Sequence, residues 1–356
     1  MTATLPEAPM QVSMQIQYDG DAVESARRVS TLEKAGLDLV WVPEAYGFDA
    51  PSFMGYIAAR TERVHIGSGI MPLFTRTPTV LAMTAAGVDA LSHGRCHVGL
   101  GASGPRVIEG WHGVPYTTPL ARTRETVEIM RNIWRREGPV RFDGQVHRLP
   151  LPAPEGSGLG TAMRLLSPPL RASVPVWIAA LGPRNVRMTA EIAEGWLPMF
   201  FVPEWADRVW GEDLRAGLAK RDPALGPLRI SAGGLLAIGP RAHRTRERAR
   251  RQLALFVGKM GAPGHNFYDA LIRRYGFGDD ADRIQRLYAA GDRAAAEAAV
   301  PEELLEATTL CGSEAYVKDR LAAYRAAGVT HVQVTPVPDD GQTEAGLVSR
   351  LKEICN

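Results

Sequence analysis

The chain has 356 residues, 45% of them apolar, which suffices for one large or two ordinary domains with a substantial core. Its formal net charge of +2 gives no strong attraction to nucleic acid or to a membrane surface, and we expect neither as a partner. Cys96, Cys311 and Cys355 are too widely separated for a metal site, so we expect no metal and a reducing environment. The N-terminus does not resemble a signal peptide, and no apolar run has the length of a membrane span. We therefore expect a cytoplasmic location.

Strand-like and helical patterns alternate through the first part of the chain. Alternating or continuous apolar runs predict strands at residues 14–18, 37–44 and 63–71, and helical spacing predicts helices at 22–35, 50–61 and 78–91. A fourth strand begins at Cys96 and runs into a glycine-rich loop, and a helix follows at 120–136. Residues 105–119 show no helical pattern, because glycines and prolines interrupt them.

Residues 141–172 break this alternation, and their many prolines and glycines predict a long excursion with a small hairpin at 142–145. The alternation then resumes, with strands predicted at 174–181, 196–201 and 228–238 and helices at 184–193 and 205–221. A mostly helical insertion is predicted at 242–310, before a last helix at 313–327, a strand at 331–336 and a closing helix. The basic run at 241–251 is better explained as a solvated helix face than as a grip on a polyanion.

Eight strands alternating with helices predict an α/β fold with a parallel sheet. Residues 33–42 resemble residues 325–334, since each segment is a helix end, a glycine stop and a buried strand. Such likeness between the second and eighth units favours a closed (β/α)8 TIM barrel over an open sheet, in a single domain of residues 1–356. Active sites of such barrels lie at the carboxyl ends of the strands, which directs attention to the residues there.

The fourth strand carries glycines at the spacing G-x-G-x-x-G, namely Gly99, Gly101 and Gly104. A dinucleotide fingerprint is rejected, because such a motif follows the first strand, opens a helix and precedes an acid about 20 residues later. What remains is a glycine-rich loop that lets the backbone approach a ligand. Its continuation holds Glu109 and His112, two candidates for chemistry.

Two further strand ends carry candidate groups. Residues 179–185 contain a small-residue turn and a helix start, which either bind a phosphate or form an ordinary turn. Glu44 ends the second strand, where its carboxylate either projects into the barrel mouth or pairs with an arginine for structural reasons. His65, His93, His97 and His147 have no partners at the spacing of metal ligands, so they are interpreted as structural.

Several motifs together resemble the luciferase-like monooxygenase superfamily, in particular its branch of coenzyme F-420-dependent oxidoreductases, including methylenetetrahydromethanopterin-reductase-like members. The motifs are Val40-Trp41-Val42-Pro43-Glu44 with Tyr46, Gly67-Ser68-Gly69-Ile70, residues 99–105 with 109–113, residues 177–183 with Gly195-Trp196, and parts of 258–276. The resemblance covers nearly the whole chain and implies a bacterial luciferase-like (β/α)8 barrel.

The resemblance also implies a set of cofactor-binding residues. It predicts a bulge with a non-proline cis peptide at Gly69-Ile70, with Ile70 against one face of a flavin-like ring. It places the acid Glu44 beside the pyrimidine end of that ring, and Gly101, Ala102 and Ser103 beside the ribityl-phosphate side. The amides of the turn would bind the phosphate; the residues concerned are Ala180, Leu181, Gly182 and Pro183.

The implied function is hydride transfer between coenzyme F-420 and a small organic substrate, in a homodimer or higher homo-oligomer. Sugar-phosphate dehydrogenases of the family place a histidine directly after the acid, whereas this chain has Ala45. Their protonation chemistry therefore does not transfer, and Tyr46, Glu109 and His112 are the candidates for handling the proton. The alternatives are an FMN-dependent monooxygenase of the same fold, which would use molecular oxygen, and a barrel that has lost its cofactor.

Overall fold

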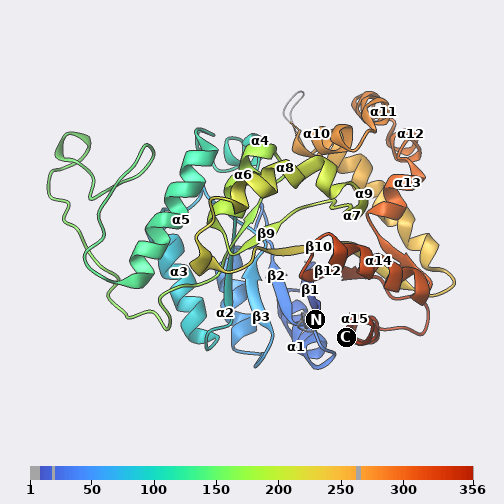
Figure 1. Cartoon of the computed structure of the whole chain (residues 1–356), viewed down its shortest axis with the longest axis horizontal. Coiled ribbons are helices and arrows are strands. Elements are labelled where there is room, and N and C mark those ends of the chain that lie inside the picture. Colours follow the sequence, from blue (N-terminus) through green and yellow to red (C-terminus); the bar gives the residue numbers. More distant parts are fainter. Residues whose placement is uncertain (1–8, 18–20, 262–265, 356) are drawn as a thin grey trace, which may run out of the picture.

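A computed structural model describes residues 9–17, 21–261 and 266–355. Parallel strands form the wall of a barrel (Figure 1), and they are β1 (Gln11–Gln15), β2 (Leu39–Val42), β3 (His65–Ser68), β5 (Cys96–Gly101), β8 (Val176–Ala179), β9 (Gly195–Leu197), β10 (Arg229–Ile238) and β12 (His331–Pro336). Each strand pairs with the next around the ring, and the pairing of Arg229 with Gly195 between β10 and β9 closes it. Within the described residues, the predicted eight-stranded (β/α)8 barrel is confirmed.

Helices alternate with these strands and cover the outside of the barrel (Figure 1). They are α1 (Ala22–Lys34), α2 (Ala50–Ala58), α3 (Pro78–Leu91), α5 (Pro119–Arg135), α6 (Pro183–Ile192), α8 (Glu212–Leu218), α14 (Glu314–Ala326) and α15 (Glu344–Cys355). Local capping explains several of these starts, since the side chains of Asp21, Asp49 and Thr77 accept backbone N–H groups at the first turns of α1, α2 and α3. In the described part of the chain, no helix combines the length and apolarity needed to cross a membrane.

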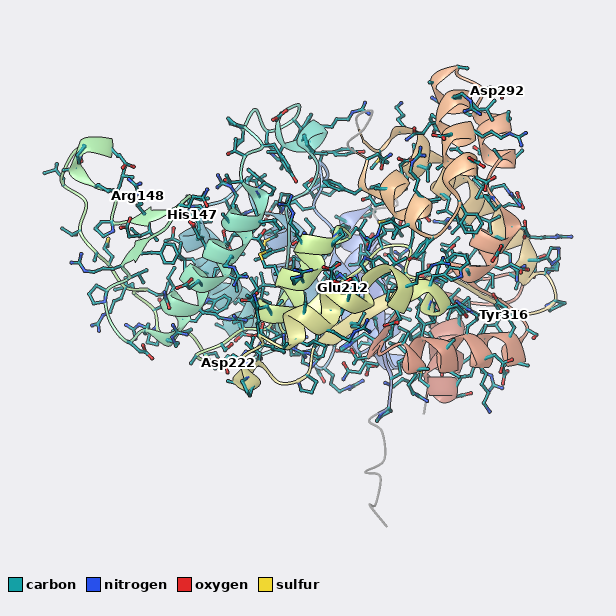
Figure 2. All side chains as sticks on the ribbon, turned by 45° about the horizontal axis from the view of Figure 1, so that its top comes forward. His147, Arg148, Glu212, Asp222, Asp292 and Tyr316 are labelled. Carbon is teal, nitrogen blue, oxygen red and sulfur yellow. The ribbon has the colours of Figure 1, made fainter. Side chains whose placement is uncertain are left out.

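Two segments leave the barrel at opposite ends of the molecule. The excursion extends from the end of α5 and holds the predicted hairpin, made of β6 (Phe142–Asp143) and β7 (Arg148–Leu149). Figure 2 shows His147 and Arg148 on this excursion, far from Asp292 on the helical insertion. The insertion comprises α9 (Arg246–Lys259), α10 (Phe267–Arg274), α11 (Gly278–Ala289), α12 (Arg293–Ala298) and α13 (Glu302–Ala307).

Tryptophan rings fill the inside of the barrel and explain two of its glycines. Trp41 and Trp177 meet edge to face at 5.2 Å, and both are buried. A Cβ atom at Gly67 would lie 2.3 Å from the Trp41 ring, and one at Gly195 would lie 2.0 Å from the Trp177 ring. The indole N–H of Trp177 donates to His97 over 2.8 Å, so His97 belongs to the barrel interior.

The structure corrects several element boundaries. The first strand is β1, three residues earlier than predicted, and Tyr18 at its predicted end lies outside the described residues. The strand predicted at 196–201 is shorter, because Phe200 has φ +54° and cannot continue it. The predicted helix at 205–221 is a run of α7 (Pro203–Ala206), a π-helical turn at Asp207–Gly211 and α8.

Short elements also appear where none was predicted, and α4 (Pro105–Ile108) and β11 (Leu310–Gly312) are examples. Residues 105–119 were expected to be non-helical, yet α4 forms one turn at their start, because Pro105 suits the first helical position and the interruptions begin at Gly110. Strand β11 ends the region predicted as helical and pairs with β10 outside the barrel ring.

Candidate active site

The predicted site residues follow the carboxyl ends of neighbouring strands. Glu44 follows β2, Ile70 follows β3, Ser103 follows β5 and Leu181 follows β8. These strands are parallel and adjacent in the closed barrel, with pairings from β2 to β3, β3 to β5 and β5 to β8. The fold therefore brings the four segments to one rim of the barrel.

An apolar side chain leans over this rim at the bulge after β3. The strand ends at Ser68 and pairing with β5 resumes in β4 (Met71–Pro72), and the peptide bond between Gly69 and Ile70 is cis, as predicted. The Ile70 Cδ1 and Cγ1 atoms lie 3.0 and 3.1 Å from the position that a Cβ would take at Gly101. Because Ile70 is half-buried, it covers the end of β5 while part of its side chain still faces outward.

The space beside Gly101 is therefore filled by Ile70. A branched side chain at Gly101 would therefore displace Ile70 before it reached any ligand space. Gly101 allows this close approach, whereas a Cβ there would force the Ile70 side chain to shift by a few tenths of an ångström.

Glu44 is engaged in an ion pair behind the rim. Glu44 is 8% exposed as a residue, and its carboxylate accepts two hydrogen bonds from the Arg76 guanidinium, over 2.6 and 2.9 Å, and one from the N–H of Ala50 over 2.9 Å. These contacts agree with the interpretation that Glu44 pairs with an arginine for structural reasons. Contact of Glu44 with a cofactor stays a prediction. The sequence analysis did not single out Arg76 as the partner of Glu44. The feature that could have indicated it is a cation directly before Thr77, the N-cap of α3.

Three non-glycine residues with left-handed backbone conformation follow strands at this rim. Ala45 after β2 has φ +44°, Ser103 after β5 has φ +57°, and Phe200 after β9 has φ +54°. Such conformations are uncommon in residues other than glycine, and they cluster at functional sites. Their placement marks the rim independently of the motifs.

The turn after β8 presents the start of a helix. Gly182 is the N-cap of α6 and Pro183 its first residue, and no side chain caps this end. The carbonyl oxygens of Ala180 and Leu181 accept hydrogen bonds from the indole N–H groups of Trp196 and Trp210, both over 2.9 Å. A Cβ at Gly182 would meet no heavy atom of the described residues within 4 Å, so in this part of the chain the helix start is open to an approaching anion.

The loop after α4 is tied back to the end of β5. The exposed Glu109 accepts the N–H of Tyr116 over 3.2 Å, and the Tyr116 hydroxyl donates to the carbonyl of Ser103 over 3.3 Å. The Tyr116 ring stacks on Phe74 at 4.9 Å, and the Arg122 guanidinium lies 4.6 Å from the Phe74 ring on a cation–π contact. Burial raises the pKa of Tyr116, so its phenol keeps its proton and donates.

His112 and Tyr46 differ in exposure. The Nε2 atom of His112 is buried, and among the described residues it has no hydrogen-bond partner. Tyr46 is 61% exposed. Within the described part of the chain, no recorded hydrogen bond or ring contact joins either side chain to another predicted site residue.

The helical insertion packs against the same rim. The Phe200 ring meets Phe256 and Tyr268 edge to face at 5.4 and 6.0 Å, and the Tyr275 hydroxyl donates to the Phe200 carbonyl over 2.8 Å. Arg106 of α4 donates to the carbonyl of Lys259, the last residue of α9, over 3.1 Å. The insertion thus contacts the segments after β9 and β5.

A cavity of about 620 Å³ opens beside the ends of β10 and β11. Its lining includes His243, Arg246, Ser313 and Glu314, and none of the predicted site residues. The cavity is therefore separate from the rim segments described above.

The rim fits a flavin-like cofactor with a phosphate. Ile70 offers an apolar side chain that is half-buried, and the uncapped start of α6 offers open space beside Gly182 for an anion. These are the two chemically different surfaces that a planar ring and a phosphate need.

Comparisons with known proteins place the chain among related sequences. The family model described as luciferase-like monooxygenase matches residues 7–331. A Mycobacterium tuberculosis protein whose provisional name is coenzyme F-420-dependent oxidoreductase is 38% identical over 92% of this chain and 96% of its own length. The 5,10-methylenetetrahydromethanopterin reductase of Archaeoglobus fulgidus is 25% identical over 90% of this chain and 92% of its own length.

Solved structures share the fold. The coenzyme F-420-dependent tetrahydromethanopterin reductase of Methanopyrus kandleri has a TM-score of 0.79 at 22% identity, covering 97% of this chain and 98% of that one. The oxygenating constituent of 3,6-diketocamphane monooxygenase from Pseudomonas putida, in complex with FMN, has a TM-score of 0.63 at 17% identity, covering 97% and 98%. The matched family model and the 38% identical relative show that the chain is an oxidoreductase of the luciferase-like monooxygenase family.

Proposed function

We propose that the protein is a coenzyme F-420-dependent oxidoreductase that transfers a hydride between the deazaflavin and a small organic substrate. The observation that carries the proposal is the 38% identity, over 92% of this chain, to a relative provisionally named for coenzyme F-420. When bound, the deazaflavin supplies the hydride-carrying carbon.

In this proposal different rim residues bind different parts of the cofactor. Gly69 and Ile70 support one face of the ring, since Ile70 leans over the rim with part of its side chain outward. Gly101, Ala102 and Ser103 border the ribityl side. The turn residues Ala180, Leu181, Gly182 and Pro183 bind the phosphate at the uncapped start of α6.

The proposal gives Glu44 a contact with the ring edge. The ion pair with Arg76 keeps the Glu44 carboxylate in one orientation. The bidentate contact with Arg76 fixes the position of the carboxylate.

The proton would be handled by Tyr46, Glu109 or His112. Tyr46 is exposed to solvent, Glu109 already accepts the N–H of Tyr116, and the buried Nε2 of His112 lacks a partner among the described residues. We expect Tyr46→Phe and Glu109→Gln to lower turnover more than cofactor affinity, because each change removes a proton-transfer group with little change in volume. If both variants keep full turnover, His112→Gln is the decisive third variant.

Fluorescence titration of the apo-protein with coenzyme F-420 and with FMN tests the cofactor assignment. We expect tight binding of F-420 and weak binding of FMN. The fold shared with an FMN-bound monooxygenase keeps FMN as the alternative. Preferential FMN binding, with oxygen consumption when the FMN is reduced, would replace the deazaflavin proposal by a monooxygenase.

The proposal includes a homodimer in the cytoplasm. The outer face of α3 presents the exposed apolar side chains of Val80, Met83 and Leu91, and Gly87 lies on the same exposed side. Large exposed apolar faces favour association. Sedimentation of the wild type and of Met83→Glu tests this, and a monomeric wild type at micromolar concentration would refute it.

A further inference from the structure

Two buried tryptophans hold the carbonyl groups of the turn after β8. Trp196, on β9, donates to Ala180, and Trp210, in the π-helical turn, donates to Leu181, each over 2.9 Å. Both indoles are completely buried, at 0% exposure. The two carbonyl oxygens are thus drawn toward the layer formed by β9 and the π-helical turn.

Peptide geometry converts this into an orientation for two N–H groups. In a trans peptide the C=O of one residue and the N–H of the next point in opposite directions. The N–H of Leu181 therefore points away from Trp196, and the N–H of Gly182 away from Trp210. In the described part of the chain neither N–H has a recorded acceptor, and the space beside Gly182 is open.

A third donor links this turn to the helical insertion. Arg274, at the end of α10, donates to the Leu181 carbonyl over 3.3 Å and also to the carbonyl of Val209. The Leu181 carbonyl is thereby held from two elements, the π-helical turn and α10. Rotation of the peptide between Leu181 and Gly182 would break both contacts.

We propose that Trp210 and Trp196 are positioning residues for phosphate recognition, which aim the N–H groups of Gly182 and Leu181 at the cofactor's phosphate without touching it. The inference rests on the proposed function, since it needs a cofactor whose phosphate binds at the start of α6. It assigns the two indole N–H groups a role in affinity for the phosphate and none in affinity for the ring.

The test compares a cofactor with its phosphate-free counterpart. Fluorescence titrations measure the dissociation constants of coenzyme F-420, of 8-hydroxy-5-deazariboflavin 5′-phosphate and of 8-hydroxy-5-deazariboflavin, the last two of which differ only in the phosphate. Trp210→Phe removes the indole donor and keeps an aromatic ring against Phe201, on which Trp210 stacks at 5.6 Å. We expect this variant to weaken F-420 binding about 5- to 10-fold and to leave binding of the deazariboflavin unchanged, as a less favourable orientation of one backbone N–H donor to a charged group predicts.

Trp134→Phe is the matched control. Trp134 is equally buried, and its indole N–H donates to the Ala82 carbonyl over 3.0 Å, between α5 and α3. The Trp134→Phe variant should leave the dissociation constants of all ligands unchanged. Trp196→Phe provides a second variant in case Trp210→Phe fails to fold.

The outcomes separate the two proposals. If the wild type binds neither coenzyme F-420 nor its phosphate-free form, and FMN and riboflavin likewise fail, the proposed function is wrong and the inference falls with it. If the wild type prefers the phosphorylated form and both tryptophan variants keep that preference, the inference alone is overturned. Equal weakening of both ligands would also overturn it, since that result indicates a packing role.

Discussion

His331 makes folding stability depend on pH below neutrality. It is the first residue of β12 and is 3% exposed, with its Nδ1 atom 2.8 Å from the Thr330 hydroxyl and its ring edge-on to Trp177 at 5.1 Å. Burial lowers the pKa of His331 from 6.5 to about 3, and the cations Arg229 and Lys352 and the ring of His65 act in the same direction. His331 is therefore neutral in the folded protein at pH 5, whereas it is protonated in the unfolded chain.

The sign and the size of the effect follow from this difference. Between pH 6.5 and about 3 the unfolded state binds one more proton at His331 than the folded state, so the free energy of unfolding falls as the pH falls. Each unit of pH well below 6.5 costs about 1.4 kcal/mol. From pH 7 to pH 5, His331 alone should remove about 2 kcal/mol of stability.

Urea unfolding of the wild type and of His331→Asn at pH 7, 6 and 5 measures this contribution. We expect the loss between pH 7 and pH 5 to be smaller by about 2 kcal/mol in the variant, whatever its absolute stability. The control is His243→Asn, which changes an exposed histidine. An unchanged pH dependence in His331→Asn would refute the reasoning. Part of the pH dependence of the free energy of unfolding remains in every variant, since burial lowers the pKa of His97 too.

Two further predictions concern the rim. Gly101→Val should displace Ile70, cost about 1–3 kcal/mol of stability and weaken cofactor binding at least 10-fold; unchanged affinity in a fluorescence titration would contradict this. Arg76→Met should leave the buried Glu44 carboxylate unpaired and cost about 2–4 kcal/mol in urea unfolding, and Glu44→Gln in the same chain should recover part of that loss. Equal stability of the single and double variants would show that the ion pair is not the source.

Local patterns were sufficient to predict the barrel and the segments that follow its strands. The helix α3 and the strand β12 have the predicted bounds, because periodicity, a proline start and glycine stops agree there. The resemblance to the luciferase-like family predicted a bulge at Gly69-Ile70, and the sheet is interrupted between Ser68 and Met71. Such features depend on a few consecutive residues and are therefore visible in one sequence.

Partners distant in the sequence could not be predicted in this way. Glu44 was assigned two open interpretations, and only the fold shows Arg76 beside it, 32 residues away. Strand β11 was included in a helical region, because its three residues gain their strand character from pairing with β10. Pairing across the sheet outweighs local propensity in a segment this short.

The turn after β8 combines both kinds of information. The small residues at 179–183 and the helix start are local, so the sequence indicated an anion-binding turn or an ordinary one and could not choose between them. The choice depends on where the peptide groups point, which is set by Trp210 and Arg274, located 29 and 93 residues beyond Leu181. In the described part of the chain, long-range donors occupy the carbonyl groups and no acceptor takes the N–H groups of Leu181 and Gly182, which favours the anion-binding interpretation.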